Sequence, residues 1–379
     1  MMRILHVTKG GGGLDTYIKQ LVTHSKLGAS CHVVASDPVN SRLSQASTKV
    51  GFEHHSIEIA REIRPKAELH SLVTLAKLIK QIAPDVIHAH SSKAGFLVRT
   101  LKFFGLTDVP VIYTPHAVAY SNGSVFMRAV AYVVEFLLGL QCEYVLCNSP
   151  SELSYIKKTL PTIRHKCGYV YNSVSNPFIE KASALSYPPK TTNGPRLILM
   201  VGRLTEQKDP TMFVHVCHLL AQEFDDVMFK IVGAGVDEHL GKKVRNYIAR
   251  KNLTNRIEIV PWLPADELAE LMATAWVLCV PSLFESFGYV AAEASCLGVP
   301  VVATDINGLR DVVAHEDTGF LVMRRDYRSM ARDVAKLLQD SELRDTLGRN
   351  GKRRAAALFD ANKNAVKVDS IYRKLTSEF

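Results

Sequence analysis

The chain has 379 residues, of which 47% are hydrophobic and 22% charged, the composition of a soluble globular protein of about two or three domains. This excludes a disordered chain, a collagen and a coiled coil. The net charge is +9, and residues 1–185 hold most of it, with 20 Lys and Arg against 12 Asp and Glu. Such a basic field favours phosphates, nucleic acid or anionic lipid surfaces, although solvated lysines on helix faces would also explain it. Since no basic run is interleaved with aromatic residues, we expect no nucleic acid and favour phosphate-bearing sugars or lipids.

The seven cysteines form no Cys-x-x-Cys pair and fall mostly within apolar runs, which indicates reduced buried thiols rather than a disulfide framework or a zinc site. After Met1 the chain enters a strand-like run without the basic and apolar segments of a signal peptide. The longest apolar stretch, Val125–Leu140, contains Arg128 and Glu135 and is shorter than the roughly 20 residues that span a bilayer. We therefore expect a cytoplasmic protein that is neither secreted nor membrane-spanning.

Short β-branched runs alternate with helical segments in the first half of the chain. The predicted strands are Arg3–Thr8, Cys31–Asp37, Asp85–His90, Pro110–His116, Cys142–Ser149 and Cys167–Val174. The predicted helices cover residues 15–27, 66–82, 92–105, 124–140 and 150–160. Near-continuous apolar strands separated by helices indicate a parallel sheet that is covered on both faces.

A proline-rich segment, Ser175–Pro195, interrupts this alternation and is predicted to be an interdomain linker. The alternation then resumes, with strands over Arg196–Gly202, Val227–Gly233, Arg256–Trp262, Trp276–Ser282 and Val299–Asp305 and helices over 209–223, 236–251, 264–274, 288–297 and 327–339. The stretch 361–379 is expected to be a helix that crosses back to the first domain. The sequence thus predicts an α/β protein with doubly wound, Rossmann-like domains over 1–175 and 196–360. Because ligands bind at the carboxyl ends of parallel strands, we expect the chemistry in a cleft between the domains.

A run of four glycines, Gly10 to Gly13, follows the first strand and precedes a helix that opens near Asp15. Such a turn lets backbone N–H groups approach an anion, and the helix dipole favours negative charge at that position. The run lacks the Gly-x-Gly-x-x-Gly spacing of a dinucleotide fold, and a tight strand-to-helix turn would also explain it.

The second domain opens with the sequence VGRLTEQKDP, residues 201–210. Arg203 and Lys208 flank a loop at the carboxyl end of a strand, ahead of a helix with Asp209 as its N-cap and Pro210 at its first position. Two cations on one such loop would clamp a diphosphate leaving group, whereas either cation alone is compatible with a solvated surface position.

Two carboxylates, Glu285 and Glu293, lie in the turn and the helix that follow the strand 276–282. The neighbours of Glu293 are small or apolar, so its carboxylate is expected to be buried and to need a polar partner. A ribose diol or sugar hydroxyls would serve. The alternative is a glutamate at a helix N-terminus together with a salt-bridged one.

Together these motifs resemble the GT-B-fold retaining glycosyltransferases of the large bacterial family 4, and the resemblance covers nearly the whole chain. It rests on Gly12-Gly13, VGRLTEQKDP, PSLFESFGYVAAEASCLGVPVVATDINGLRDVV and the spacing Glu285-x7-Glu293. It implies an N-terminal acceptor-side domain that faces a C-terminal nucleotide-sugar donor domain. Ser286 and Asn307 stand where glycine is more usual in the family, and asparagine tolerates left-handed backbone.

The resemblance also implies roles for individual residues. Arg203 and Lys208 would bind the donor diphosphate, Glu293 the ribose hydroxyls and Glu285 the donor sugar. Further donor-binding residues implied by it are Gly12, Gly13, Gly233, Gly235, Trp262, Phe287 and Gly288. His116 would lie beside the donor sugar, although a structural histidine after a strand would look the same.

His88 and His90 receive no role at this stage. No Asp-x-Asp motif occurs, and enzymes of this fold generally neutralise the leaving group with cations and helix dipoles. We therefore expect neither a metal nor a cofactor beyond the nucleotide-sugar substrate.

The leading hypothesis is a retaining glycosyltransferase that moves a sugar from a nucleoside diphosphate to a lipid-linked (polyprenyl diphosphate) or glycan acceptor in bacterial surface polysaccharide synthesis, of the O-antigen or capsule type. A UDP-N-acetylhexosamine or UDP-hexose is favoured as donor, and a GDP-mannose-dependent mannosyltransferase is the first alternative. A nucleotide-sugar epimerase and a non-catalytic protein bound peripherally to the membrane are the others.

The segment 93–104 suggests contact with an anionic membrane surface. Read as a helix, it places Lys93, Arg99 and Lys102 near a face that also carries Phe103, and basic aromatic helices can lie in a bilayer interface. A sheet-packed helix with a solvated basic side is the alternative. We expect peripheral association with the inner face of the cell membrane through this helix.

Overall fold

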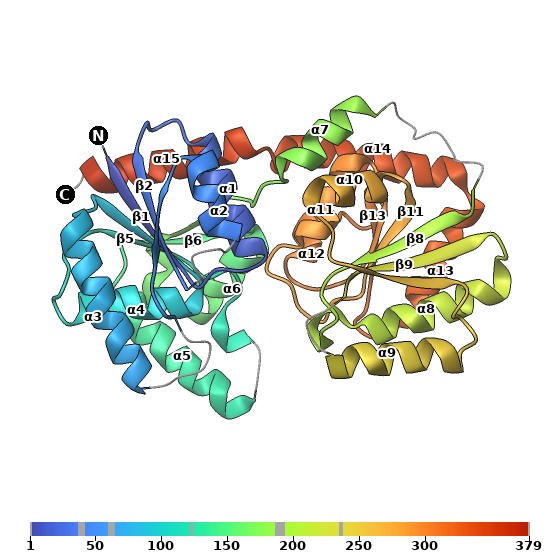
Figure 1. Ribbon diagram of the computed structural model, residues 1–379, viewed down its shortest axis with the longest axis horizontal. Coiled ribbons are helices and arrows are strands. Elements are labelled where there is room, and N and C mark those ends of the chain that lie inside the picture. The colour runs from blue at the N-terminus through green and yellow to red at the C-terminus, as the bar shows by residue number, and fades with distance from the viewer. Residues whose placement is uncertain are drawn as a thin grey trace. The chain divides into compact units, whose positions relative to one another are not determined.

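The computed structural model describes residues 2–36, 42–59, 65–121, 124–185, 194–234 and 238–377. The chain divides into two units, the first formed by Met1–Ser173 with Ala361–Phe379 and the second by Val174–Asp360. Each unit is a parallel sheet with helices on both faces (Figure 1). The predicted α/β class with two doubly wound sheets is confirmed.

Seven parallel strands form the first sheet, in the order β3-β2-β1-β4-β5-β6-β7. They are β1 (Arg3–Thr8), β2 (Ser30–Ala35), β3 (Glu53–Ser56), β4 (Val86–His90), β5 (Val111–Thr114), β6 (Tyr144–Cys147) and β7 (Cys167–Tyr169). The accompanying helices are α1 (Gly13–His24), α2 (Arg42–Val50), α3 (Pro65–Ile82), α4 (Ser91–Phe103), α5 (Val125–Gly139), α6 (Pro150–Thr159) and α15 (Ala361–Ser377). Every residue of β4 is buried, as expected for a central strand that helices cover on both sides.

Successive side chains of the central strands enter two separate cores. Leu5 and Ile87 pack with the helices on one face of the sheet, whereas Ile4 and Val86 pack with the cluster that includes residues of α1 and α15. The C-terminal helix α15 is tied to this second face by Asp369, which accepts hydrogen bonds from the Ser25 hydroxyl (2.8 Å) and the Lys26 amide (2.6 Å).

Six parallel strands form the second sheet, in the order β10-β9-β8-β11-β12-β13. They are β8 (Arg196–Val201), β9 (Val227–Ala234), β10 (Ile257–Pro261), β11 (Ala275–Val280), β12 (Val301–Thr304) and β13 (Gly319–Val322). The helices are α7 (Asn176–Ala184), α8 (Pro210–Glu223), α9 (Glu238–Arg250), α10 (Ala265–Ala273), α11 (Tyr289–Leu297), α12 (Leu309–Val312), α13 (Tyr327–Gln339) and α14 (Ser341–Leu358).

The strand order creates one switch point in each sheet, where the chain begins to add strands on the other side. It lies between β1 and β4 in the first unit and between β8 and β11 in the second. Loops that leave the carboxyl ends of such neighbouring strands diverge and expose a crevice to ligands. The glycine run follows β1, and the loop that contains Lys208 follows β8, so both predicted anion-binding segments stand at these points.

The expected linker over Ser175–Pro195 is wrong in its first part. Residues Asn176–Ala184 form α7, which Pro177 opens in its first turn and which belongs to the second unit through an ion pair between Lys181 and Glu270. A proline in the first turn supports a helix rather than interrupting it, because the N–H that it lacks would be unpaired there anyway. Residues 186–193 lie outside the described part of the chain.

Five further elements, β3, β13, α2, α12 and α14, were not predicted from the sequence. β3 has the sequence EHHS, which lacks the apolar residues that would predict a strand. It forms an edge strand through its parallel backbone pairing with β2. All seven cysteines are free, and six of them are buried, as their apolar surroundings predicted.

Candidate functional site

The switch point of the second sheet brings two loops together. The loop after β8 contacts the loop after β11 through backbone groups, since the Leu283 amide donates to the Gln207 carbonyl at 2.8 Å. The Gln207 side-chain amide donates in turn to the Phe284 carbonyl at 3.0 Å. These two bonds fix the cation-bearing loop against the glutamate-bearing loop, although about 75 residues separate them in the sequence.

Lys208 and Glu285 form an ion pair across these loops, and both side chains are largely buried. The same Glu285 carboxylate oxygen accepts a hydrogen bond from the Ser282 hydroxyl at 2.9 Å. An ion pair of this kind holds both groups in a defined orientation, because each charge left alone would be costly to desolvate. The structure therefore unites the predicted diphosphate-binding lysine with the predicted sugar-binding glutamate.

Arg203 is exposed at the start of the same loop, and its side chain has no hydrogen-bond or ion-pair partner among the described residues. Its guanidinium is available to an anion, and its planar fork suits the oxygen pairs of a phosphate. The Lys208 side chain packs against Gly202, which directly follows β8, so closely that a Cβ at that glycine would lie 3.2 Å from it. The loop thus offers one engaged cation and one available cation.

Glu293 lies on α11 and is only 8% exposed. Burial raises the pKa of its carboxyl to about 8, and the nearby Lys208 charge opposes this rise. No other side chain in the described ranges donates a hydrogen bond to it. A buried carboxyl without a partner is expensive, so the arrangement favours a polar ligand that donates to Glu293.

Two glycines shape the turn before α11. Gly288 caps the helix with a φ of 90° and Gly308 has a φ of 84°, both in the left-handed region that favours glycine. A Cβ at Gly308 would lie 2.8 Å from the amide nitrogen of Phe287, so the 308 backbone and the 285–287 turn pack directly against each other. Phe287 is fully buried and packs edge to face against Phe359, with ring centroids 5.2 Å apart.

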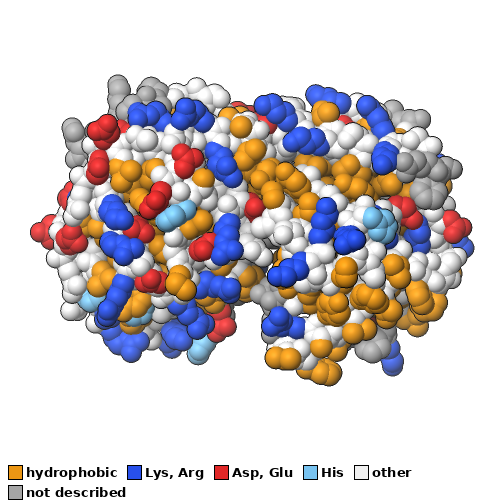
Figure 2. Space-filling model, turned by 180° about the vertical axis from the view of Figure 1, so that it is seen from behind, with side chains coloured by type: hydrophobic (Ala, Val, Ile, Leu, Met, Phe, Trp, Pro, Cys, Tyr) orange, Lys and Arg blue, Asp and Glu red, His pale blue; other side chains and the backbone are white. Residues whose placement is uncertain are grey.

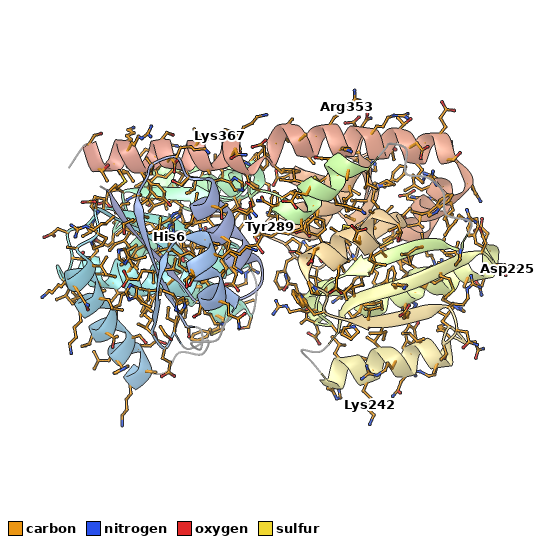
Figure 3. The ribbon with its side chains drawn as sticks, turned by 45° about the horizontal axis from the view of Figure 1, so that its top comes forward. His6, Asp225, Lys242, Tyr289, Arg353 and Lys367 are labelled. Atoms are coloured by element: carbon orange, nitrogen blue, oxygen red, sulfur yellow. The ribbon has the colours of Figure 1, made fainter. Side chains whose placement is uncertain are left out.

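Helix α11 begins four residues after Glu285 and has no side-chain N-cap, and a helix N-terminus favours an anion placed beside it. Tyr289 opens the helix at this position (Figure 3). The Phe287 side chain contributes packing rather than a contact surface for a ligand.

The remaining predicted donor-site residues differ in their setting. Gly233, at the end of β9, approaches the β8 loop so closely that a Cβ there would lie 2.8 Å from the Gly202 carbonyl oxygen. Trp262 is 51% exposed after β10. Gly235 lies outside the described residues.

In the first unit the glycine run wraps the start of α1. Gly10, Gly11 and Gly12 all have positive φ, and the Gly11 amide donates to the Asp15 carboxylate at 2.8 Å. A Cβ at Gly11 or Gly12 would meet nothing within 4 Å, so these glycines serve backbone conformation rather than close packing. Gly12 is the N-cap of α1 and Gly13 its first residue, which leaves the loop open at a helix N-terminus.

His116 belongs to a hydrogen-bonded row of histidines at the carboxyl ends of β1, β4 and β5. Its Nδ1 lies 3.0 Å from the Asn148 amide nitrogen, its Nε2 lies 3.3 Å from His90 Nδ1, and His90 Nε2 lies 3.0 Å from His6 Nδ1. With the Asn148 side-chain nitrogen donating to His116 Nδ1, His116 donates through Nε2 to His90 Nδ1, and His90 donates through Nε2 to His6 Nδ1.

The backbone at His116 is unusual as well. His116 and Ala117 have φ values of 52° and 106°, conformations that cost non-glycine residues energy and persist only when neighbours enforce them. Glu152 enforces this conformation, because its carboxylate accepts hydrogen bonds from the backbone N–H of Ala117 at 3.1 Å and from the backbone N–H of Asn148 at 2.8 Å.

Burial keeps these histidines neutral. It lowers the pKa of His6 and of His116 to about 3, and it lowers those of His88 and His90 well below the usual range, with the neighbouring imidazoles adding to the effect. His6 lies inside the first unit (Figure 3). His88, left unassigned from the sequence, bonds the Tyr372 hydroxyl of α15 at 2.6 Å and Thr114 at 2.8 Å.

Two groups of described residues have the donor atoms for a metal ion: His6 with His88 and His90, and His32 with Glu53 and His55. In the first group both ring nitrogens of His88 and of His90 are already in hydrogen bonds. Sequence reasoning gave no role to Asn148 or Ser282. Asn148 directly follows β6, and Ser282 lies two residues after β11 within the PSLFESFG motif, so a polar residue near the carboxyl end of a strand was the available signal.

The predicted membrane-binding face of 93–104 is wrong. Lys93 pairs with Glu68, Arg99 is 1% exposed and donates to the Glu135 carboxylate at 2.9 Å, and Lys102 donates to Glu143 at 2.6 Å. The helix α4 is therefore a core element whose cations are neutralised inside the unit. Among the described helices, none has both the length and the apolarity needed to cross a bilayer.

Comparison with known families covers nearly the whole chain. Residues 11–176 match the model for glycosyltransferase family 4, and residues 187–354 match the model for glycosyl transferases group 1. A UDP-Gal:alpha-D-GlcNAc-diphosphoundecaprenol alpha-1,3-galactosyltransferase from Escherichia coli is 26% identical over 83% of this chain and 81% of its own. The capsular polysaccharide biosynthesis glycosyltransferase CapM from Staphylococcus aureus is 24% identical over 99% of this chain and 98% of its own.

Solved structures share the fold. A sucrose-phosphate synthase from Thermosynechococcus elongatus superposes with a TM-score of 0.83 at 20% identity and covers all of both chains. HepE from Anabaena, in complex with UDP and glucose, superposes with a TM-score of 0.80 at 19% identity over 98% of this chain and 99% of its own. At these identities the likeness concerns the fold.

Proposed function

Because its two halves match these two models, the chain belongs to the GT-B glycosyltransferases of the family 4 type and uses a nucleotide-sugar donor. We propose that it transfers a hexose or N-acetylhexosamine from a UDP-sugar to a lipid-linked acceptor with retention of configuration. The product would enter a bacterial surface polysaccharide. The E. coli relative, named for transfer from UDP-Gal to a diphosphoundecaprenol-linked sugar, supports the donor and acceptor, and CapM, named for capsular polysaccharide biosynthesis, supports the destination of the product.

One observation carries the proposal: in the second unit the Lys208–Glu285 ion pair joins the β8 loop, which Arg203 begins, to the turn that leads into α11, the helix that carries the buried Glu293. Each part matches a part of a sugar nucleotide. Cations and the helix dipole suit the diphosphate, Glu285 suits sugar hydroxyls, and Glu293 suits a ribose diol whose two hydroxyls donate to it.

The chemistry follows from charge. When the bond between the sugar's anomeric carbon and the diphosphate oxygen breaks, the electron pair stays on that oxygen and its negative charge increases. Arg203 and Lys208 would stabilise this charge, an effect that grows toward the transition state and therefore raises kcat. The acceptor hydroxyl forms the new bond, and its proton leaves with the nucleoside diphosphate or passes to solvent.

Metal independence is part of the proposal. The two cations and the α11 N-terminus would supply the positive charge that a divalent ion provides in other transferases. EDTA should leave the rate unchanged, and a loss of activity that Mg²⁺ restores would overturn this part.

UDP is favoured as the nucleotide because the E. coli relative is named as a UDP-galactose enzyme and HepE was solved with UDP. GDP-mannose remains the second candidate. A diphosphoundecaprenol-linked acceptor is confined to the membrane by its lipid. We therefore propose that the enzyme works at the inner membrane face.

The test is a thermal-shift panel of UDP- and GDP-sugars, followed by transfer to a synthetic polyprenyl diphosphate sugar with the anomeric configuration of the product read by NMR. A ligand that binds only the folded state raises the melting temperature through RT ln(1+[L]/Kd). Transfer with retention from a UDP-sugar is expected. Inversion, C2 epimerisation without acceptor, or no turnover with any sugar nucleotide would each overturn the proposal, the last in favour of a non-catalytic binding protein.

A further inference from the structure

The outer face of α5 is apolar, which reverses the usual polarity of a surface helix. Large hydrophobic side chains are exposed along its whole length. Their exposed fractions are 82% for Val125, 75% for Phe126, 40% for Val130, 53% for Val133, 37% for Phe136, 54% for Leu137 and 55% for Leu140, the residue that caps the helix. We call these seven residues the α5 face.

The α5 face is one continuous strip rather than a scatter of exposed residues. At 100° per residue the seven side chains fall within an arc of about 140°, together with the small Ala129. No polar residue lies inside this arc. The helix carries two charged side chains, Arg128 and Glu135, and both stand on the opposite side.

That opposite side anchors the helix through polar groups. Glu135 is 5% exposed and accepts from Arg99 and from the Tyr113 hydroxyl, each at 2.9 Å, while the Arg99 guanidinium lies 3.8 Å above the Tyr113 ring. Gly139 brings the helix close to Ile163. A carboxylate therefore faces the protein interior and hydrocarbon faces outward, so burial in the core does not explain the apolar face.

The exposed charges of the chain stretch that carries the α5 face, residues 124–166, have a single sign. Over the described residues 124–166 the exposed charged side chains are Arg128, Lys157, Lys158 and Arg164. The three carboxylates of this stretch, Glu135, Glu143 and Glu152, are each engaged inside the unit. Figure 2 shows hydrophobic side chains gathered along the lower edge of the first unit, with Lys and Arg at the border.

The inner rim of the helix is aromatic and amphipathic. The Tyr132 hydroxyl donates to the Thr159 carbonyl at 3.1 Å, and the Tyr120 hydroxyl lies 2.6 Å from Thr159 Oγ1. Lys166 donates to the Cys142 carbonyl at 2.6 Å, beside the end of the helix. Tyrosines and cations beside a strip of hydrocarbon are the arrangement that a lipid interface favours, with the apolar part among acyl chains and the polar tips at the headgroups.

We propose that the α5 face docks on an anionic lipid bilayer, with its seven apolar side chains inserted at the level of the upper acyl chains and the surrounding cations at the phosphates. The surface differs from the one expected from the sequence, which lies on α4 and whose three cations are paired with carboxylates of the same unit. A second copy of the chain fits less well, because two α5 faces in contact would bring together cations without exposed carboxylates to oppose them. The proposal goes beyond the proposed function, since it states how the chain is held at a membrane.

The experiment uses the full chain with vesicles of phosphatidylcholine, with and without phosphatidylglycerol, and no sugar substrate. A Phe126→Glu/Val133→Glu variant should lose vesicle binding by about a hundredfold or more, because two buried apolar side chains are replaced by charges that the surface repels. The matched control is Leu69→Glu/Val73→Glu on α3, where the two residues are 64% and 47% exposed. It changes the charge equally and should bind like the parent.

A second pair of variants reports insertion directly. The added tryptophan fluorescence of Phe126→Trp should be quenched by brominated phospholipids, whereas that of Leu69→Trp should not. The two variants can be compared directly because both also contain Trp262 and Trp276. Neutralising Lys157, Lys158 and Arg164 to Gln should abolish the preference for phosphatidylglycerol and its sensitivity to salt. UDP binding by every variant is measured in solution as a check on folding.

The proposal is overturned if the parent stays in the supernatant with phosphatidylglycerol vesicles at low salt, if both glutamate pairs reduce binding equally, or if both tryptophans are quenched alike. It is also overturned if the parent is a dimer that Phe126→Glu/Val133→Glu dissociates and that does not bind vesicles, because the occupant would then be a second copy. These outcomes are independent of sugar transfer, so failure here and failure of the proposed function are separate results.

Discussion

Lys208 and Glu285 form an ion pair across the two loops that leave β8 and β11, with the Ser282 hydroxyl on the same glutamate oxygen. This pair links the group expected to bind the leaving phosphate to the group expected to bind the sugar. The effects of substitutions at these two residues should therefore not be additive, as is usual for residues in contact.

Replacing Lys208 by Ala should lower kcat by about 10²–10³-fold, the loss seen when one preorganised stabiliser of a developing charge is removed. Arg203→Ala should act in the same direction. Steady-state kinetics with a saturating UDP-sugar measures both effects. Lys230→Ala is the matched control, since Lys230 forms an exposed ion pair with Glu258 at 2.9 Å in the same sheet. Turnover of the Lys208 variant within a factor of two of the parent would remove the proposed role.

Glu293→Gln should stabilise the protein while weakening nucleotide binding. The folded-state pKa of about 8 lies above the ordinary value of 4.5, so the penalty begins as the pH rises above 4.5 and is complete above 8. At pH 7 the variant should be more stable by about 3 kcal/mol in urea unfolding, and at pH 4 the difference should vanish. Exposed Glu206→Gln is the control and should show no such pH dependence.

The affinity for UDP supplies a second readout of the same residue. If ribose hydroxyls donate to ionised Glu293, UDP binding should strengthen by up to about tenfold per pH unit between pH 6.5 and 8. Titration calorimetry across this range should show the rise in the parent and a flat profile in Glu293→Gln. A Glu293→Gln variant that binds UDP as tightly as the parent at pH 8 would contradict the ribose assignment.

Gly308→Ala should disturb the Glu285 turn because the new Cβ meets backbone atoms of Ser286 and Phe287, each at 2.8 Å. We expect a loss of about 3 kcal/mol in unfolding free energy, from left-handed strain and overpacking together, and a fall in kcat. Gly105→Ala separates the two causes: its φ is 66°, but nothing lies within 4 Å of the added Cβ. That control should lose only about 1 kcal/mol and keep its activity.

The buried histidines should make the first unit sensitive to acid. The pKa of His6 is about 3 when folded and about 6.5 when unfolded, so the unfolded state binds the proton first and stability falls as the pH drops below 6.5. At pH 5 this single histidine should account for about 2 kcal/mol. His6→Gln should flatten the dependence of unfolding free energy on pH by about one proton, whereas exposed His165→Gln should not. Equal slopes in the two variants would refute the assignment.

Much of the fold could be predicted from the sequence because it depends on patterns of neighbouring residues. β1 begins and ends at the predicted residues, and the glycine run, the Asp209-Pro210 helix start and the two glutamates are all placed correctly relative to their strands. These features depend on periodicity, capping and steric preference, which act over a few residues. The short edge strand β3 was missed because EHHS has no apolar alternation, and its pairing with β2 supplies what its side chains do not.

Contacts between distant segments were decided by the tertiary structure. The strand order places β8 beside β11, and only this neighbourhood brings Lys208 to Glu285. The same is true of Asn148 and His116, joined because β5 and β6 are adjacent. The sequence shows which residues can carry charge or hydrogen bonds, whereas the topology determines which of them meet.

The two helices considered for the membrane show the limit most clearly. The sequence of α4 has cations beside aromatic residues and predicts a membrane-binding face, whereas that of α5, apolar with Arg128 and Glu135 within it, predicts only that it does not span a bilayer. In the structure Glu135 pairs with Arg99 inside the unit, while seven apolar side chains of α5 are exposed. Two buried charges need each other as partners, so the sides of α4 and α5 that carry them face one another. The amino-acid sequence determined that both helices form, whereas the contact between these distant segments decided which side of each helix meets the solvent.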